Sequence, residues 1–178
     1  TEGRPVGWMP PMNGAIELCY AMDLQPVFPE NWSPVCAAFG LTPQNFKVSE
    51  DMGYSRDLCG YLRNIIGYVN GLMNKADTPL GRLPEPDFLL TPGGGCVPVM
   101  KIFHELERRF PNARVFRADL PQVAVEDINE AYIDYAIAES NRLIDFLSEI
   151  TGKKLDMDRL RETVILSDRA CALWDEIM

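Results

Sequence analysis

The 178-residue sequence lacks any apolar run close to the roughly 18 residues that a membrane-spanning helix needs. Residues 1–20 lack the basic start and the long apolar stretch of a signal peptide. No Gly-rich or polar low-complexity tract is present, and 47% of the residues are hydrophobic, which argues against a disordered or fibrous protein. We therefore expect a soluble, cytoplasmic protein with a packed core.

Positive charge is scarce and scattered. The chain has 17 Lys and Arg residues against 26 Asp and Glu residues, a net charge of −9, which would repel a polyanion. The phosphate-binding sequence GxxxxGK[ST] is absent, and the Gly93-Gly94-Gly95 triplet lacks the later glycine of GxGxxG. We expect no nucleic-acid partner, no P-loop and no nicotinamide site, although a few Arg or Lys residues can still hold a small anion.

Strand and helix patterns alternate along the first two thirds of the chain. Short apolar segments bounded by turn residues predict strands at 4–9, 25–28, 87–91 and 113–117. Apolar periodicity and helix-start signals predict helices at 13–23, 33–40, 42–52, 55–72 and 98–110, then two long helices at 126–151 and 157–178. This pattern predicts an α/β fold with a doubly wound parallel sheet of about four strands and a C-terminal helical pair.

The same pattern predicts how the chain is divided. We expect an α/β domain at 1–121 and a helical extension at 122–178.

The five cysteines include no CxxC pair, so they predict neither a disulfide framework nor an oxidising compartment. A helix N-terminus favours the thiolate form, which ligates metals. Cys36, Cys59 and Cys96 fall near predicted helix starts, whereas Cys19 and Cys171 fall inside predicted helices and are interpreted as packing residues. Coincidence is the alternative explanation for the first three.

Cys96 follows the glycine triplet at the carboxyl end of a predicted strand, which is where doubly wound sheets bind ligands. Gly94 and Gly95 allow the backbone to approach a cofactor closely. Thiolates from distant loops suit an iron-sulfur cluster better than a structural zinc, which takes closely spaced pairs. Three protein thiolates would leave one iron open to a substrate oxygen.

Several stretches resemble the 2-hydroxyacyl-CoA dehydratase and benzoyl-CoA reductase family. They are GWMP at 7–10, IEL at 16–18, AMDLQPV at 21–27, FPEN at 28–31, GYSRDLCGYLR at 53–63, and PDFLL at 86–90 leading to Cys96. The stretch around Cys59 is the most specific of these.

The resemblance implies an oxygen-sensitive enzyme component that acts in anaerobic metabolism and holds a 4Fe-4S cluster. It also implies that the domain at 1–121 binds this cluster, and that the helical extension at 122–178 leads to a second domain absent from this chain. Such a component receives single electrons from an ATP-hydrolysing activator protein, reduces a CoA thioester to a ketyl-type radical, and pairs with a related second subunit. Carried over by position, Cys59 and Cys96 are cluster ligands, and Cys36 matches a cysteine found in part of the family. Glu17 matches a family position and is a candidate for proton transfer, or alternatively a solvated or capping residue.

Two departures bear on the branch of the family. Gly93, Gly94 and Gly95 stand where the family often has Asn, a difference that bears on the substrate and on the type of cluster. No Ser lies near the end of the first predicted strand, which favours the reductase branch. Two alternatives stay open. One is a non-catalytic scaffold subunit or fragment of such a complex, and the other is a double-cubane cluster reductase of small molecules.

Three further polar residues have two interpretations each. Arg56 and Arg63 are candidates for contacts with CoA phosphates or are solvated helix charges. His104, the sole histidine, is interpreted as a surface or packing residue rather than a general base.

Overall fold

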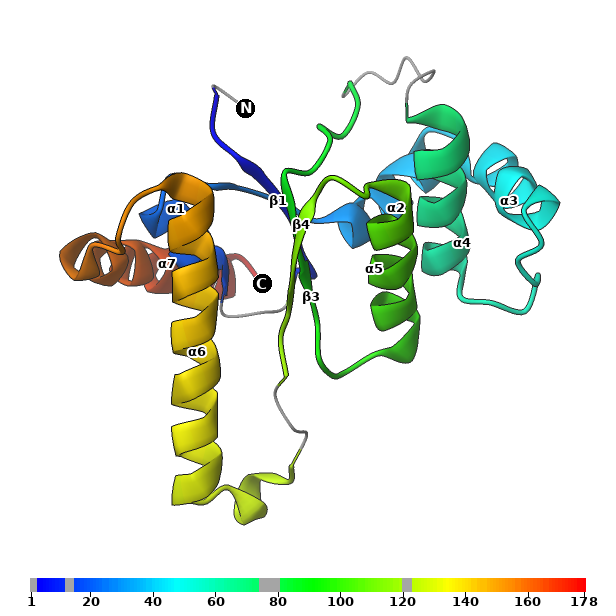
Figure 1. Ribbon diagram of the computed structural model, residues 1–178. Helices are drawn as coiled ribbons and strands as arrows, with labels where there is room; N and C mark the ends of the chain where they lie inside the picture. The colour runs from blue at the N-terminus through cyan, green and yellow to red at the C-terminus, as the bar shows by residue number, and fades with distance from the viewer. Residues whose placement is uncertain (1–2, 12–14, 74–80, 120–122) are drawn as a thin grey trace.

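The computed structural model describes residues 3–11, 15–73, 81–119 and 123–178 (Figure 1). Four strands form one parallel sheet in the order β2-β1-β3-β4. They are β1 (Val6–Trp8), β2 (Gln25–Val27), β3 (Phe88–Thr91) and β4 (Arg114–Arg117). The expected doubly wound α/β fold is therefore confirmed.

Seven α-helices accompany these strands in the described part of the chain. They are α1 (Ala15–Ala21), α2 (Pro29–Ala38), α3 (Thr42–Asp51), α4 (Gly60–Gly67), α5 (Val97–Arg109), α6 (Glu130–Thr151) and α7 (Met157–Ile177). A π-helical turn at Tyr68–Leu72 extends α4, and a 3-10 turn at Val125–Asp127 precedes α6. Most of these elements lie within a few residues of their predicted positions.

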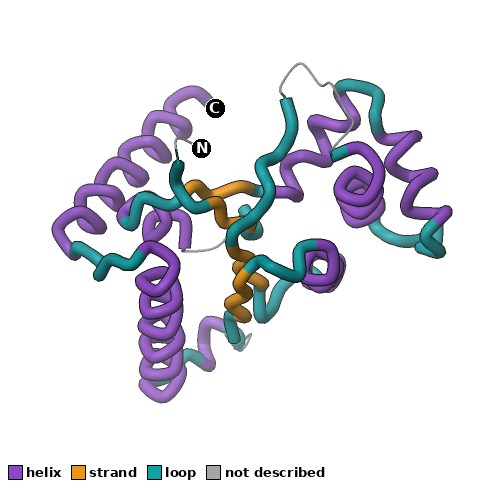
Figure 2. The backbone as a smooth tube through the Cα atoms, turned by 45° about the horizontal axis from the view of Figure 1, so that its top comes forward, coloured by secondary structure: helices purple, strands orange, loops and turns teal. Residues whose placement is uncertain are grey.

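Helices cover both faces of the sheet, as Figures 1 and 2 show. Because successive side chains of a strand point to opposite faces, Leu89 packs into the core beneath α4 and α5, whereas Phe88 and Leu90 pack into the core beneath α1 and α6. The result is a three-layer α/β/α arrangement in which both sheet faces are buried.

The strand order reverses between β1 and β3, because α1 leads from β1 to β2 on one face, whereas α5 leads from β3 to β4 on the other. In doubly wound sheets, ligands bind outside the carboxyl ends of the strands at such a switch point. The segment that carries Cys96 leaves the sheet there, directly after β3.

Two helices begin elsewhere than the sequence predicts. α2 begins at Pro29 rather than after Ser33, whose hydroxyl instead donates to the Tyr61 carbonyl in α4 at 3.1 Å. α4 begins at Gly60 rather than after Ser55, because the Ser55 hydroxyl accepts the Asp57 N–H at 3.2 Å in a local turn.

The two C-terminal helices pack on the α/β part of the chain. Leu147 of α6 is fully buried against the sheet, and α7 packs against α1. Arg159 of α7 forms an ion pair with Asp23, which follows α1. The expected domain boundary at 121/122 lies outside the described residues. No helix in the described ranges is long and apolar enough to cross a membrane.

Candidate cysteine site

Cys59 and Cys96 occupy equivalent positions on neighbouring helices. Cys59 is the N-cap residue of α4 and Cys96 is the N-cap residue of α5, and neither thiol accepts a capping hydrogen bond. The two helices pack against each other and begin at the same end, at the carboxyl edge of the sheet (Figure 1). Cys59 is half-buried and Cys96 is exposed. The expected placement of both thiols at helix N-termini is confirmed.

The backbone around the glycine triplet explains why two of its residues are glycine. A Cβ at Gly93 would lie 1.7 Å from the Ala118 carbonyl oxygen, so only glycine fits against the segment that follows β4. Gly95 has a φ of +93°, a left-handed conformation that disfavours other residues. These two constraints fix the backbone path from β3 to Cys96 at the start of α5. A cofactor contact at Gly94 and Gly95 stays a prediction.

Cys36 is the one candidate ligand whose predicted setting is wrong. It lies in the last turn of α2 rather than the first, because the helix starts at Pro29, and its side chain is 0% exposed in the core beneath α4. Burial raises the pKa of the Cys36 thiol, although a hydrogen bond with Asn45 acts in the opposite direction. This setting favours the neutral thiol. The ligand role of Cys36 stays a prediction.

The two cysteines interpreted as packing residues differ from each other. Cys19 is 0% exposed, as predicted, and burial with a smaller contribution from nearby Glu17 raises its pKa to about 12. Cys171 is exposed, so its predicted packing role is wrong within this chain. The apolar residues around it on α7, including Leu173 and Trp174, are also exposed.

The described residues contain no group of three or more His, Cys, Asp or Glu side chains that could hold a metal ion. The donor set at the carboxyl edge therefore fits a cluster in part. Cys59 and Cys96 share one end of two parallel helices and are accessible, whereas further ligands must come from beyond these two thiols.

Glu17 lies on α1, which covers the opposite sheet face from α4 and α5. Its carboxylate accepts the Ser167 hydroxyl of α7 at 2.8 Å, so it helps to join α1 to α7. Its role in proton transfer stays a prediction.

The two candidate phosphate-binding arginines are both paired with Glu50 of α3. Arg56 is exposed, whereas Arg63 is buried and is not available to a phosphate in solution. His104 is exposed on α5, which agrees with its interpretation as a surface residue.

Sequence reasoning missed Tyr54, which lies in the loop before Cys59. Its phenol is hydrogen-bonded to Glu105 of α5, and burial, followed by this contact, raises the pKa of Tyr54 to about 12. Tyr54 thus ties the loop that leads to Cys59 to the helix that starts after Cys96. The one sequence signal that could have identified Tyr54 is its position in the family-like stretch at 53–63.

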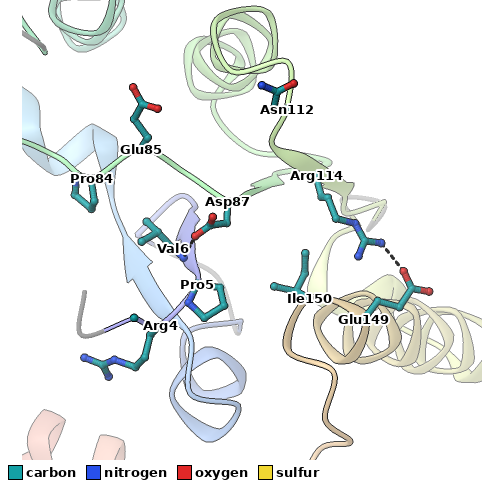
Figure 3. Close-up of a pocket in the computed structure, with 11 residues that line it drawn as sticks. Arg4, Pro5, Val6, Pro84, Glu85, Asp87, Asn112, Arg114, Glu149 and Ile150 are labelled. Atoms are coloured by element: carbon teal, nitrogen blue, oxygen red, sulfur yellow. Dashed lines mark hydrogen bonds and ion pairs between the residues drawn. The ribbon is translucent and has the colours of Figure 1, made fainter.

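An open pocket of about 700 Å³ lies at the other edge of the sheet (Figure 3). It is lined by residues at the amino ends of three strands, Val6, Asp87 and Arg114 among them. The Asp87 carboxylate accepts the Val6 N–H at 2.7 Å, and Arg114 pairs with Glu149. Both charged groups therefore already have partners within the fold. Ligands of doubly wound sheets bind at the carboxyl edge, so we assign no site here.

Comparison with known proteins places the chain in a family. Residues 12–178 match the family described as 2-hydroxyglutaryl-CoA dehydratase, D-component, so the chain belongs to that family. It is 31% identical over 180 residues to the (R)-2-hydroxyisocaproyl-CoA dehydratase alpha subunit of Clostridioides difficile, covering 97% of this chain and 41% of that protein.

Two further relatives represent the dehydratases and the reductases. The chain is 28% identical to the (R)-phenyllactyl-CoA dehydratase alpha subunit of Clostridium sporogenes over 97% of its length and 41% of the relative. It is 32% identical to a benzoyl-CoA reductase polypeptide of Thauera aromatica over 68% of its length and 28% of the relative. The chain thus spans about two fifths of the length of the first two relatives.

Proposed function

We propose that this chain is part of an iron-sulfur enzyme component that reduces a CoA thioester by single-electron chemistry, in either a 2-hydroxyacyl-CoA dehydratase or a benzoyl-CoA reductase. Family membership supports the class of enzyme. The observation that carries the site is that Cys59 and Cys96 lie at the N-termini of two helices that pack together and begin at one end of the sheet.

We propose Cys59 and Cys96 as the ligands that this chain contributes to a 4Fe-4S cluster. When bound, such a cluster supplies single electrons to the substrate. The chain's own part is to present two thiols where the N–H groups and dipole of each helix favour the thiolate. The glycine-constrained backbone after β3 and the Tyr54–Glu105 contact keep the two helix starts in place.

The proposal includes partners. The two dehydratase relatives described above are alpha subunits, which supports a related second subunit for this chain. We also propose an ATP-hydrolysing activator as electron donor, a cytoplasmic location, and a further domain after the helical extension at 122–178. The share of the relatives' length that the chain leaves uncovered supports the further domain.

Anaerobic reconstitution with iron and sulfide tests the cluster. In the protein that includes the proposed further domain, which would supply the remaining ligands, we expect iron and acid-labile sulfide in about equal amounts, near four per chain. Cys59→Ser and Cys96→Ser should each lower the iron content severalfold, whereas Cys171→Ser, the exposed control on α7, should not. Cys36→Ala tests the predicted ligand role of Cys36, against which the burial of this thiol in the core favours retention of iron.

Four outcomes distinguish the hypotheses. A folded wild-type protein that includes the further domain and takes up neither iron nor sulfide would contradict the proposal and favour a non-catalytic scaffold. About twice the expected iron would favour a double-cubane cluster. Loss of iron in Cys36→Ala would support Cys36 as a further ligand. Retention of iron in both Cys59→Ser and Cys96→Ser would remove the proposed site.

A further inference from the structure

Arg63 is a buried cation whose partners all belong to the segment that leads to Cys59. Its side chain is 10% exposed, and Nη2 pairs with Glu50 in the last turn of α3. Nη1 donates to the Arg56 carbonyl at 3.1 Å, and the guanidinium carbon lies 4.0 Å above the centre of the Phe46 ring. Nε has no partner in the described part of the chain, so these three contacts hold the guanidinium.

The position of Arg63 in α4 explains how one side chain reaches the preceding loop. Its backbone N–H donates to the Cys59 carbonyl at 3.0 Å, so the residue lies one turn after the N-cap. Long side chains of helical residues point back toward the helix N-terminus. The Arg63 side chain therefore lies over the 52–59 loop.

From this geometry we propose that Arg63 is a positioning residue for Cys59. By binding the Arg56 carbonyl and Glu50 at once, it fixes the loop between α3 and α4 and so holds the Cys59 thiol at the start of α4. This inference rests on the proposed function, in which Cys59 is a cluster ligand, but the effect of Arg63 on Cys59 can be measured without a cluster.

The contact with the Arg56 carbonyl requires an arginine. The guanidinium presents its donors as a rigid planar fork, which lets it serve a carboxylate and a carbonyl in different directions. The Arg56 side chain also pairs with Glu50 but is 82% exposed, and such surface pairs contribute little to stability. The chain therefore offers a buried and an exposed arginine with the same acidic partner.

The test is the alkylation rate of each cysteine in the native, cluster-free protein, measured by mass spectrometry. Arg63→Met keeps the apolar stem but loses both donors. We expect the Cys59 rate to rise roughly tenfold while the Cys96 rate stays within about twofold of wild type, because local opening exposes the loop and not α5. Arg63→Lys should also give a Cys59 alkylation rate above that of wild type, since one ammonium group cannot replace the planar guanidinium.

Arg56→Gln is the matched control, because it removes the exposed charge but keeps the backbone carbonyl that Arg63 binds. It should leave the Cys59 rate unchanged. Three results would overturn the inference: an equal rise at Cys59 and Cys96 in Arg63→Met, a rise at Cys59 in Arg56→Gln, or a wild-type rate in Arg63→Lys. If Arg63→Met fails to fold, Arg63→Lys and Arg56→Gln decide. Iron content tests the proposed function separately, since the alkylation pattern is measured without iron.

Discussion

The five cysteines occupy surroundings that differ in both access and charge. Cys96 and Cys171 are exposed, Cys59 is half-buried, and Cys19 and Cys36 are buried in the two cores on either side of the sheet. Burial slows the reaction of Cys19 and Cys36 in two ways. It keeps the reagent away from the sulfur, and it raises the pKa of each thiol, so that less of the reactive thiolate is present.

We expect alkylation of the native protein at mildly alkaline pH to separate these thiols. Cys96 and Cys171 should react first, Cys59 next, and Cys19 and Cys36 slowest, because a pKa of about 12 keeps the Cys19 thiol protonated under these conditions. Mass spectrometry at timed intervals gives the order. In concentrated urea all five rates should converge, and a native Cys36 rate equal to that of Cys96 would show that the core beneath α4 is open.

Sequence could predict the residue types at the site but not every environment. Rules for helix starts placed Cys96 correctly before α5. They placed Cys59 near a helix start but put that start at Ser55, whereas α4 begins after Cys59. Cys36 was misplaced because Ser33-Pro34 has a favoured N-cap residue before its proline, whereas Phe28-Pro29, where α2 begins, has only the proline. The Ser33 hydroxyl instead donates to the Tyr61 carbonyl, a tertiary contact that local sequence does not show.

At the scale of elements, α3 and α4 form a close helix pair near the site. Gly67 of α4 is buried, and a Cβ there would lie 1.8 Å from the Asn45 carbonyl oxygen of α3. Asn45 also donates to the Asn64 side chain at 2.6 Å, which joins the two helices by a buried hydrogen bond. The contact therefore depends on a glycine and on an asparagine pair.

Gly67→Ala should destabilise the protein by about 3 kcal/mol, because backbone cannot move away from the added methyl group without separating α3 from α4. Gly60→Ala, at the start of the same helix, is the control. Its Cβ would lie 3.7 Å from the Phe46 ring, an ordinary contact, and alanine favours the helix. Urea unfolding measures both. Equal stabilities for the two variants would contradict the close approach.

Helix positions were predictable from apolar periodicity and from Pro and Gly, whereas the start of α4 was not. Ser55 has the side chain of a good N-cap, yet it closes a turn with Asp57, and the helix starts after Cys59. Arg63 of α4 anchors that turn by binding the Arg56 carbonyl of the loop and Glu50 of α3. A rule based on a few neighbouring residues cannot predict a helix start that depends on such contacts.

At the scale of the whole molecule, ion pairs join the C-terminal helices to the α/β part. Arg159 and Lys153 both pair with Asp23, which follows α1. The hydrogen bond from Arg159, with a smaller contribution from Lys153, lowers the pKa of Asp23 from 3.8 to about 2. Because the folded-state pKa is the lower one, the stabilisation is present above the unfolded pKa and is lost as pH falls through about 2.

An NMR titration of the Asp23 carboxyl group should therefore have its midpoint near 2. Arg159→Met should move the midpoint up toward 3.8, and Lys153→Met should move it less, because its ammonium lies 3.4 Å from the carboxylate and contributes the smaller hydrogen bond. A midpoint near 3.8 in the wild type would show that α7 is not docked on this corner in solution.

The sequence by itself determined the α/β class, the parallel sheet to be expected from alternation, and the family, because periodicity and short motifs are local properties of the chain. Tertiary structure alone decided which thiols share an edge. Burial of Cys36, exposure of Cys171 and the common starting end of α4 and α5 all depend on which helix packs on which face of the sheet. Such contacts join residues far apart in the chain, so no window of sequence contains them.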